Sequence, residues 1–122
     1  MEPTRIFLVG LPRLREEIVT HLLEPEPDLA LVGTQRSPAG LARKVKRSRA
    51  DVVLIGQDDP TLIAELLCRC PRVAVLAVQE EAGETALYAL RPERVLVGRL
   101  TPQQLAGTLR QAALTNSAWW ER

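Results

Sequence analysis

The sequence is poor in the side chains that most metal and catalytic sites use. Its 122 residues include one histidine, four aromatic residues and two cysteines, Cys68 and Cys70. A structural zinc site takes about four ligands, and cysteines two positions apart on a helix point to different faces. We therefore expect no metal and no disulfide. Both cysteines are expected to be buried as small hydrophobic side chains, and His21 to be a partly exposed structural residue.

Long hydrophobic runs are also absent. No apolar stretch approaches the roughly 18–20 residues that a membrane helix needs. The N-terminal residues lead into an apolar run of four residues, Ile6–Val9, which lacks the longer apolar core and cleavage site of a signal peptide. With a net charge of +1, the composition predicts a cytoplasmic globular domain without membrane contact or general affinity for polyanions.

Short apolar runs alternate with helical segments along the chain. The runs predict strands buried on both faces at Ile6–Val9, Leu29–Val32, Val52–Ile55, Val73–Val78 and Val95–Val97. Helical periodicity falls at Leu14–Leu22, Leu41–Arg49, Leu62–Cys68, Glu81–Leu90 and after Thr101-Pro102-Gln103-Gln104. Asp59 and Pro60 are typical of a helix cap and first helical position. This alternation predicts an α/β fold: one doubly wound, five-stranded parallel sheet with five helices over residues 1–114, and a tail over residues 115–122.

Ligands of such folds bind outside the carboxyl ends of the strands. Four of the seven glycines follow predicted strands there: Gly10, Gly33, Gly56 and Gly98. Their backbone N–H groups could cradle an anion, although no complete phosphate-binding motif is present. The alternative is that small residues merely fill tight turns.

Several strings, in chain order, resemble receiver domains of two-component response regulators, closest to those of LuxR-type regulators. Residues 8–16, LVGLPRLRE, are similar to the family's LVDDHPLVRE, and residues 23–33, LEPEPDLALVG, to LLESEPDLEVVG. Residues 49–55, RADVVLI, are similar to RPDVVLLD, and residues 101–105, TPQQL, to SPEEL. The resemblance spans Arg5 to about Leu114 and implies a flavodoxin-like fold.

The resemblance fails at the residues that carry receiver chemistry. It places the Mg²⁺-binding acidic pair of the family on Gly10 and Leu11, and the phosphoacceptor aspartate on Gly56. The Ser or Thr of the family falls on Gln79, and its lysine falls on Gly98. Glycine supplies neither a nucleophile nor a metal ligand. Asp58 and Asp59 follow Gly56 so closely that they are expected to point past the pocket. We therefore expect no catalytic residue, no metal and no cofactor, as in a degenerate, phosphorylation-independent receiver.

Two surfaces are expected to bind partners. The resemblance implies protein contacts or dimerisation through the fourth helix, fifth strand and last helix, or through the first and last helices. The residues expected there include Leu87 and the set Tyr88, Arg91, Leu105, Leu109, Trp119 and Trp120. Tryptophan is enriched in interface hot spots, although the Trp pair could equally cap its own helix.

A basic segment covers the second predicted helix. Its members are Arg43, Lys44, Lys46, Arg47 and Arg49. A solvated helix face is the default interpretation, followed by a surface for an acidic protein. Nucleic acid ranks last because no aromatic residues are interleaved for base stacking.

The leading functional hypothesis is a non-enzymatic protein-interaction module in signalling, regulation or assembly, working with a protein partner or as a homodimer. One alternative is a sensor of a nucleotide or other anion bound above Gly10, Gly56 and Gly98. Another is an N-terminal module of a larger transcription regulator or of a ParA/MinD-like pilus-assembly ATPase.

Overall fold

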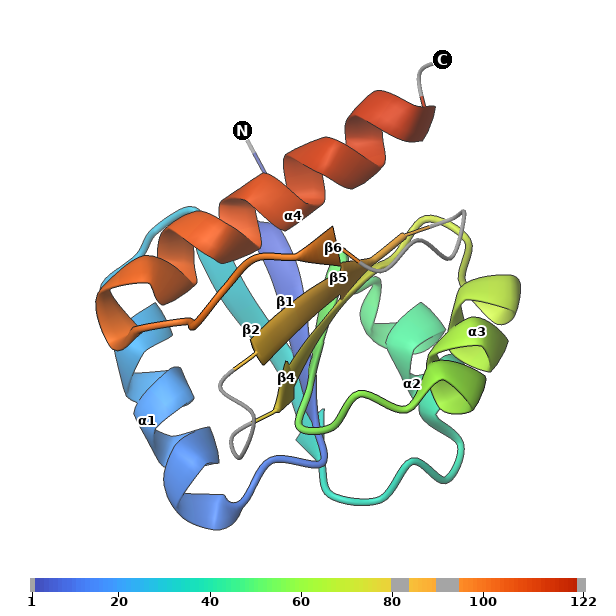
Figure 1. Cartoon of the computed structure of the whole chain (residues 1–122), viewed down its shortest axis with the longest axis horizontal. Coiled ribbons are helices and arrows are strands. Elements are labelled where there is room, and N and C mark those ends of the chain that lie inside the picture. Colours follow the sequence, from blue (N-terminus) through green and yellow to red (C-terminus); the bar gives the residue numbers. More distant parts are fainter. Residues whose placement is uncertain (1, 80–83, 90–94, 121–122) are drawn as a thin grey trace.

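The computed structural model describes residues 2–79, 84–89 and 95–120, with the side chains of residue 95 and residues 114–120 left out. Its centre is a six-stranded sheet in the order β2-β1-β3-β4-β5-β6 (Figure 1). The strands are β1 (Thr4–Val9), β2 (Leu29–Gln35), β3 (Val52–Ile55), β4 (Ala74–Gln79), β5 (Glu84–Tyr88) and β6 (Val95–Leu96). The first four strands are parallel to one another, and β5 is antiparallel to both of its neighbours.

Four α-helices and a 3-10 turn accompany these strands in the described residues. They are α1 (Arg13–Leu23), α2 (Leu41–Ser48), α3 (Pro60–Arg69), the turn η1 (Pro102–Gln104) and α4 (Leu105–Trp120). The caps agree with the sequence signals: the Asp59 carboxylate accepts from the Leu62 N–H at 3.2 Å, and Gln104 Oε1 accepts from the Thr101 N–H at 3.3 Å. The predicted α/β class and the first four predicted strands are confirmed by the observed elements.

The predicted helix over Glu81–Leu90 is wrong, because Glu84–Tyr88 forms β5. Residues 85–89 are all buried, whereas a helix covering a sheet would keep one side in solvent. Ala86 and Tyr88 face one core and Leu87 the other, which is the two-residue period of a strand. The sheet is therefore mixed rather than wholly parallel. The fold is broadly flavodoxin-like, but it is not the predicted doubly wound domain with five helices.

Helices cover both faces of the sheet, each over its own hydrophobic core. The α2–α3 core joins helix residues to strand residues of one face, among them Leu41, Val45, Ile63, Leu66, Phe7, Val53 and Val75. The α1–α4 core covers the other face and includes Val19, Leu23, Leu105, Leu109, Ile6, Leu54 and Leu76. This division places α1 and α4 side by side, on the opposite side of the sheet from α2 and α3.

The last helix is longer than predicted. Helix α4 continues to Trp120, so residues 115–120 of the expected tail are helical, and its red ribbon crosses the sheet obliquely in Figure 1. None of the helices in the described part of the chain is long and apolar enough to cross a membrane.

Candidate functional site

Backbone fills the strand ends at which a receiver would be phosphorylated. Gly10 follows β1 and Gly56 follows β3, two directly paired parallel strands. A Cβ atom added to Gly56 would lie 2.4 Å from the carbonyl oxygen of Gly10 and 2.9 Å from its carbonyl carbon, far inside van der Waals contact. Gly10 itself has a φ of +69°, and its N–H donates to the Gln35 carbonyl at 2.9 Å. Position 56, where the resemblance places the phosphoacceptor, therefore has no room for a side chain in this backbone conformation.

The other expected pocket residues lie apart from this glycine contact. Leu11 is buried in the α1–α4 core, and Gln79 is half-buried at the end of β4. Gly98 follows β6, which lies three strand positions from β3, or about 14 Å at the usual strand spacing. The structure thus brings Gly10 and Gly56 together without Gly98, so the three glycines do not line one cradle.

The two aspartates after β3 have structural partners. Asp59 caps α3. The Asp58 Oδ1 atom accepts a hydrogen bond from the hydroxyl of Tyr88 on β5 at 2.5 Å. Within the described residues, no group of three or more His, Cys, Asp or Glu side chains could hold a metal ion. These carboxylates therefore support the fold around α3 and β5.

Much of the expected partner surface is buried. Tyr88 is 5% exposed, and Leu105 and Leu109 are 4% and 0% exposed. Leu87 is also buried, between the sheet and α4. Arg91 lies outside the described residues. Trp119 and Trp120 belong to the backbone of α4, and their side chains are not described. A surface built on a fourth helix does not form, because β5 takes its place.

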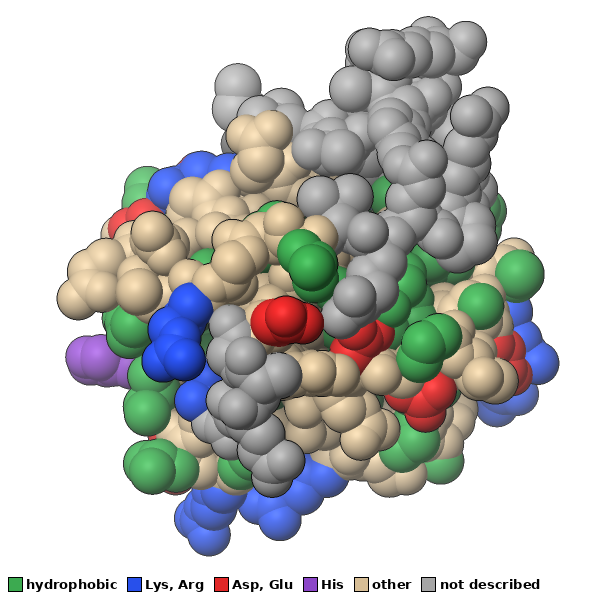
Figure 2. All heavy atoms as spheres, in the orientation of Figure 1, with side chains coloured by type: hydrophobic (Ala, Val, Ile, Leu, Met, Phe, Trp, Pro, Cys, Tyr) green, Lys and Arg blue, Asp and Glu red, His purple; other side chains and the backbone are tan. Residues whose placement is uncertain are grey.

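An apolar hollow lies between α1 and the start of α4, at the carboxyl edge of the sheet. Its volume is about 190 Å³, and its lining includes Ile18, Leu22, Val78, Leu100, Pro102 and Leu105, with the charged side chain of Arg15. Ile18, which lines the hollow, is 47% exposed, and Leu14, one turn earlier on α1, is 70% exposed. Figure 2 shows hydrophobic side chains at the surface over α1, on the left. Helical periodicity places Leu14 and Ile18 on one stripe with Leu22, so the sequence pattern by itself does not show that the first two are exposed.

The basic segment lies on α2 and on the residue that follows it, and it is exposed. Leu41 and Val45 anchor the helix in the α2–α3 core. The cations expected as a basic patch are all exposed: Arg43, Lys44, Lys46, Arg47 and Arg49. None of these five side chains forms a hydrogen bond or an ion pair with a described residue. We call this surface the basic α2 face.

The cysteines differ from each other in exposure. Cys70 is buried, its thiol lies 3.6 Å from the Ala42 carbonyl oxygen, and burial raises the pKa of this thiol. The expectation that Cys68 is buried is wrong, because it lies outside the inward stripe of α3 formed by Ile63, Leu66 and Leu67. His21 is exposed beside Glu24, with 4.0 Å between Nδ1 and Oε2.

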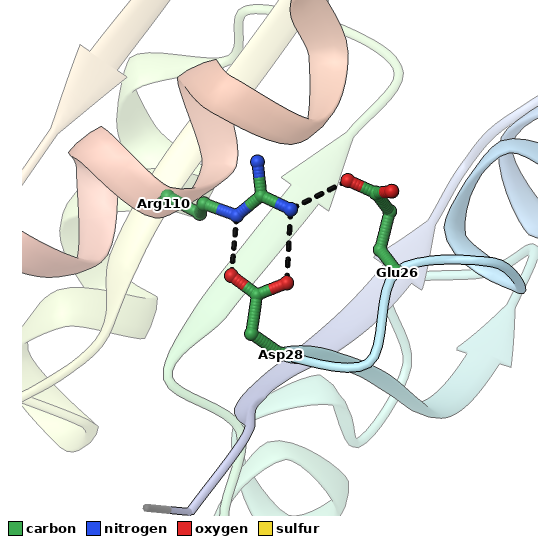
Figure 3. A network of polar contacts seen from close by, with 3 residues as sticks. All are labelled: Glu26, Asp28 and Arg110. Atoms are coloured by element: carbon green, nitrogen blue, oxygen red, sulfur yellow. Dashed lines mark hydrogen bonds and ion pairs between the residues drawn. The ribbon is translucent and has the colours of Figure 1, made fainter.

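One arginine ties the last helix to the loop before β2 (Figure 3). Arg110 on α4 donates from Nε and Nη2 to both carboxylate oxygens of Asp28, with 2.9 Å between Nη2 and Oδ1. Nη2 also donates to Oε1 of Glu26 at 2.5 Å. The hydrogen bonds from Arg110 lower the pKa of Asp28, and those to Asp28 and Glu26 raise the pKa of Arg110. A planar guanidinium suits this two-pronged contact, which links α4 to the loop before β2.

We expect Arg110→Gln to make the stability of the fold less sensitive to acid. The pKa of Asp28 is lower in the folded than in the unfolded state. The ion pair of Asp28 with Arg110 therefore stabilises the fold at pH values above the unfolded-state pKa, and this contribution is lost as the pH falls through the folded-state pKa. Urea midpoints between about pH 2 and pH 6 at low salt should therefore decline less in Arg110→Gln than in the wild type. Arg13→Gln, which removes an exposed pair with Glu17, should follow the wild type. Coincident profiles for Arg110→Gln and the wild type would contradict this assignment.

No protein-family model matches the chain, and no curated protein sequence matches it. The structure defines a mixed α/β domain of broadly flavodoxin-like architecture. Its candidate sites are the contact between Gly10 and Gly56, the apolar surface of α1 formed by Leu14 and Ile18, and the basic α2 face.

Proposed function

We propose that this chain is a phosphorylation-independent pseudo-receiver that acts as a protein-interaction domain in signalling, regulation or assembly and is not an enzyme. The sequence motifs that resemble receivers, together with the strand order β2-β1-β3-β4, support the receiver-like character of the chain. The contact between Gly10 and Gly56 supports its independence from phosphorylation, since aspartyl phosphorylation needs a carboxylate nucleophile and a Mg²⁺ ion held by neighbouring carboxylates.

The observation that carries the proposal is the exposure of Leu14 and Ile18 beside the apolar hollow. These side chains lie one turn apart on α1 and are 70% and 47% exposed. Burying a leucine or isoleucine that was fully in water contributes about 1.5–3 kcal/mol, so a partner seated here would gain free energy from both. The surface belongs to the first and last helices, one of the two faces that the receiver resemblance implies.

We expect Leu14→Glu/Ile18→Glu to abolish partner binding while the domain stays folded. Both side chains are solvent-exposed, so their replacement leaves the α1–α4 core intact, whereas buried carboxylates at the interface would be strongly unfavourable. The measurement is affinity capture from native lysate with identification by mass spectrometry. Sedimentation of the purified chain tests for a second copy as the partner.

The chain offers a matched control on another surface. Leu96 and Val97 are 53% and 43% exposed at and just after β6, so Leu96→Glu/Val97→Glu makes the same kind of change elsewhere. A partner, or self-association, should survive in this control and be lost with Leu14→Glu/Ile18→Glu. Loss in the β6 variant alone would assign the contact to the other edge of the sheet. Absence of any partner and of self-association would count against the proposed function.

A further inference from the structure

Charge is unevenly distributed over this nearly neutral chain. Five of its 16 Lys and Arg residues form the basic α2 face, and the other 11 stand against 15 Asp and Glu. The rest of the chain therefore has a net charge of −4, while this one helix surface carries +5. Such local fields attract polyanions even when the overall charge is near zero.

The basic α2 face has the composition of a phosphate-binding surface rather than a protein interface. Every exposed residue on α2 itself is a cation, while its hydrophobic members are Leu41 and Val45, which are buried, and Ala42, which is half-buried. Protein–protein interfaces accept arginine but contain a hydrophobic centre, and this face exposes no hydrophobic residue. Protein–nucleic acid interfaces are polar and strongly positive.

The length of α2 is enough to bring its cations near several phosphates of a double helix. The eight residues of α2 span about 12 Å of helix axis. Duplex DNA presents one phosphate charge per roughly 1.7 Å, or about seven over that length. Free guanidinium and ammonium groups, unpaired with described residues, can contact these phosphates without first breaking an ion pair.

We propose that the basic α2 face binds the phosphate backbone of double-stranded nucleic acid without reading its sequence. The missing aromatic residues argue against single strands, whose binding relies on base stacking, but not against a duplex contacted through its backbone. The face has no Asn or Gln amide of the kind that reads adenine. Arginine can read guanine through two hydrogen bonds, and two duplexes of unrelated sequence distinguish such readout from contact with the backbone alone. Because α2 and α1 lie on opposite sides of the sheet, this inference is independent of the proposed protein-interaction surface.

The test is fluorescence anisotropy of a labelled duplex of about 20 base pairs, titrated with the full chain at several salt concentrations. If all five cations neutralise phosphates, the logarithm of the association constant should fall with the logarithm of salt with a slope of about −4.5. Two duplexes of unrelated sequence should give the same slope and affinity. Lys44→Gln/Arg47→Gln removes two of the five contacts and should reduce the slope by about 1.8.

The matched control is Arg13→Gln/Arg99→Gln, which removes the same charge from two exposed arginines outside α2. It should retain wild-type affinity and slope. Equal losses in both double variants would overturn the proposal, since the effect would then follow net charge. So would dissociation constants weaker than about 1 mM at 50 mM salt, against the roughly 1–100 μM typical of non-specific binding. Binding to polyglutamate or to phosphatidylserine vesicles but not to the duplex would also overturn it, and would indicate an acidic protein or a membrane instead.

Discussion

Gly56→Ala is expected to destabilise the domain by about 3 kcal/mol, the upper part of the usual range for overpacking. The added methyl group would stand 2.4 Å from a backbone carbonyl oxygen and 3.3 Å from the Cα atom of Leu11. The backbone at the ends of two paired strands cannot move to relieve this overlap, whereas a flexible side chain could change its rotamer. The measurement is the free energy of unfolding from urea denaturation followed by circular dichroism.

Gly107→Ala provides the same chemical change with the opposite expected sign. Gly107 lies on α4, and a Cβ atom there meets nothing within 4 Å. Alanine in a helix is favoured over glycine by about 0.5–1 kcal/mol, so this variant should be more stable than the wild type. A Gly56→Ala protein as stable as the wild type would show that the two loops separate readily, and the close contact between Gly10 and Gly56 would no longer be supported.

Leu109→Ala is expected to cost about 3 kcal/mol, within the range of large-to-small substitutions in cores. The Leu109 side chain is 0% exposed and packs between α4 and the sheet. Leu14→Ala makes the same substitution at a side chain that is 70% exposed, and should change the free energy of unfolding by less than about 0.5 kcal/mol. Urea denaturation of both variants measures the difference.

The comparison decides which leucine is free to contact a partner. If Leu109 anchors α4, its truncation impairs folding, and any loss of binding is secondary. If Leu14 belongs to a contact surface, its truncation weakens binding while the stability of the isolated domain is unchanged. Similar small stability effects at both positions would contradict the burial of Leu109 and return it to the expected partner surface.

Local sequence signals predicted most of the fold. The apolar runs of β1, β2, β3 and β4 are continuous because both sheet faces are covered. The caps at the start of α3 and before α4 are formed by residues only a few positions apart, with Asp59 and Pro60 at the first and Gln104 at the second. Such short-range interactions can be recognised without knowing the rest of the structure.

The segment Glu84–Tyr88 shows where local signals were insufficient. Helical periodicity suggested a helix, but the backbone of this segment pairs with β4 on one side and β6 on the other. Hydrogen bonds to two neighbouring strands outweigh a weak intrinsic preference. The hydroxyl of Tyr88 then meets Asp58, thirty positions earlier in the chain, a contact that no local pattern predicts.

The candidate sites divide in the same way. The sequence alone determined that Gly10 and Gly56 supply no carboxylate, and that five cations cluster on and directly after one helix, because both follow from residue identity and helical period. Only the tertiary structure decided that Gly56 touches the Gly10 carbonyl, that Leu14 is exposed while Leu109 is buried, and that Arg110 reaches Asp28, 82 positions away. These properties depend on which distant segments the sheet brings together, and the packing of the whole chain sets them.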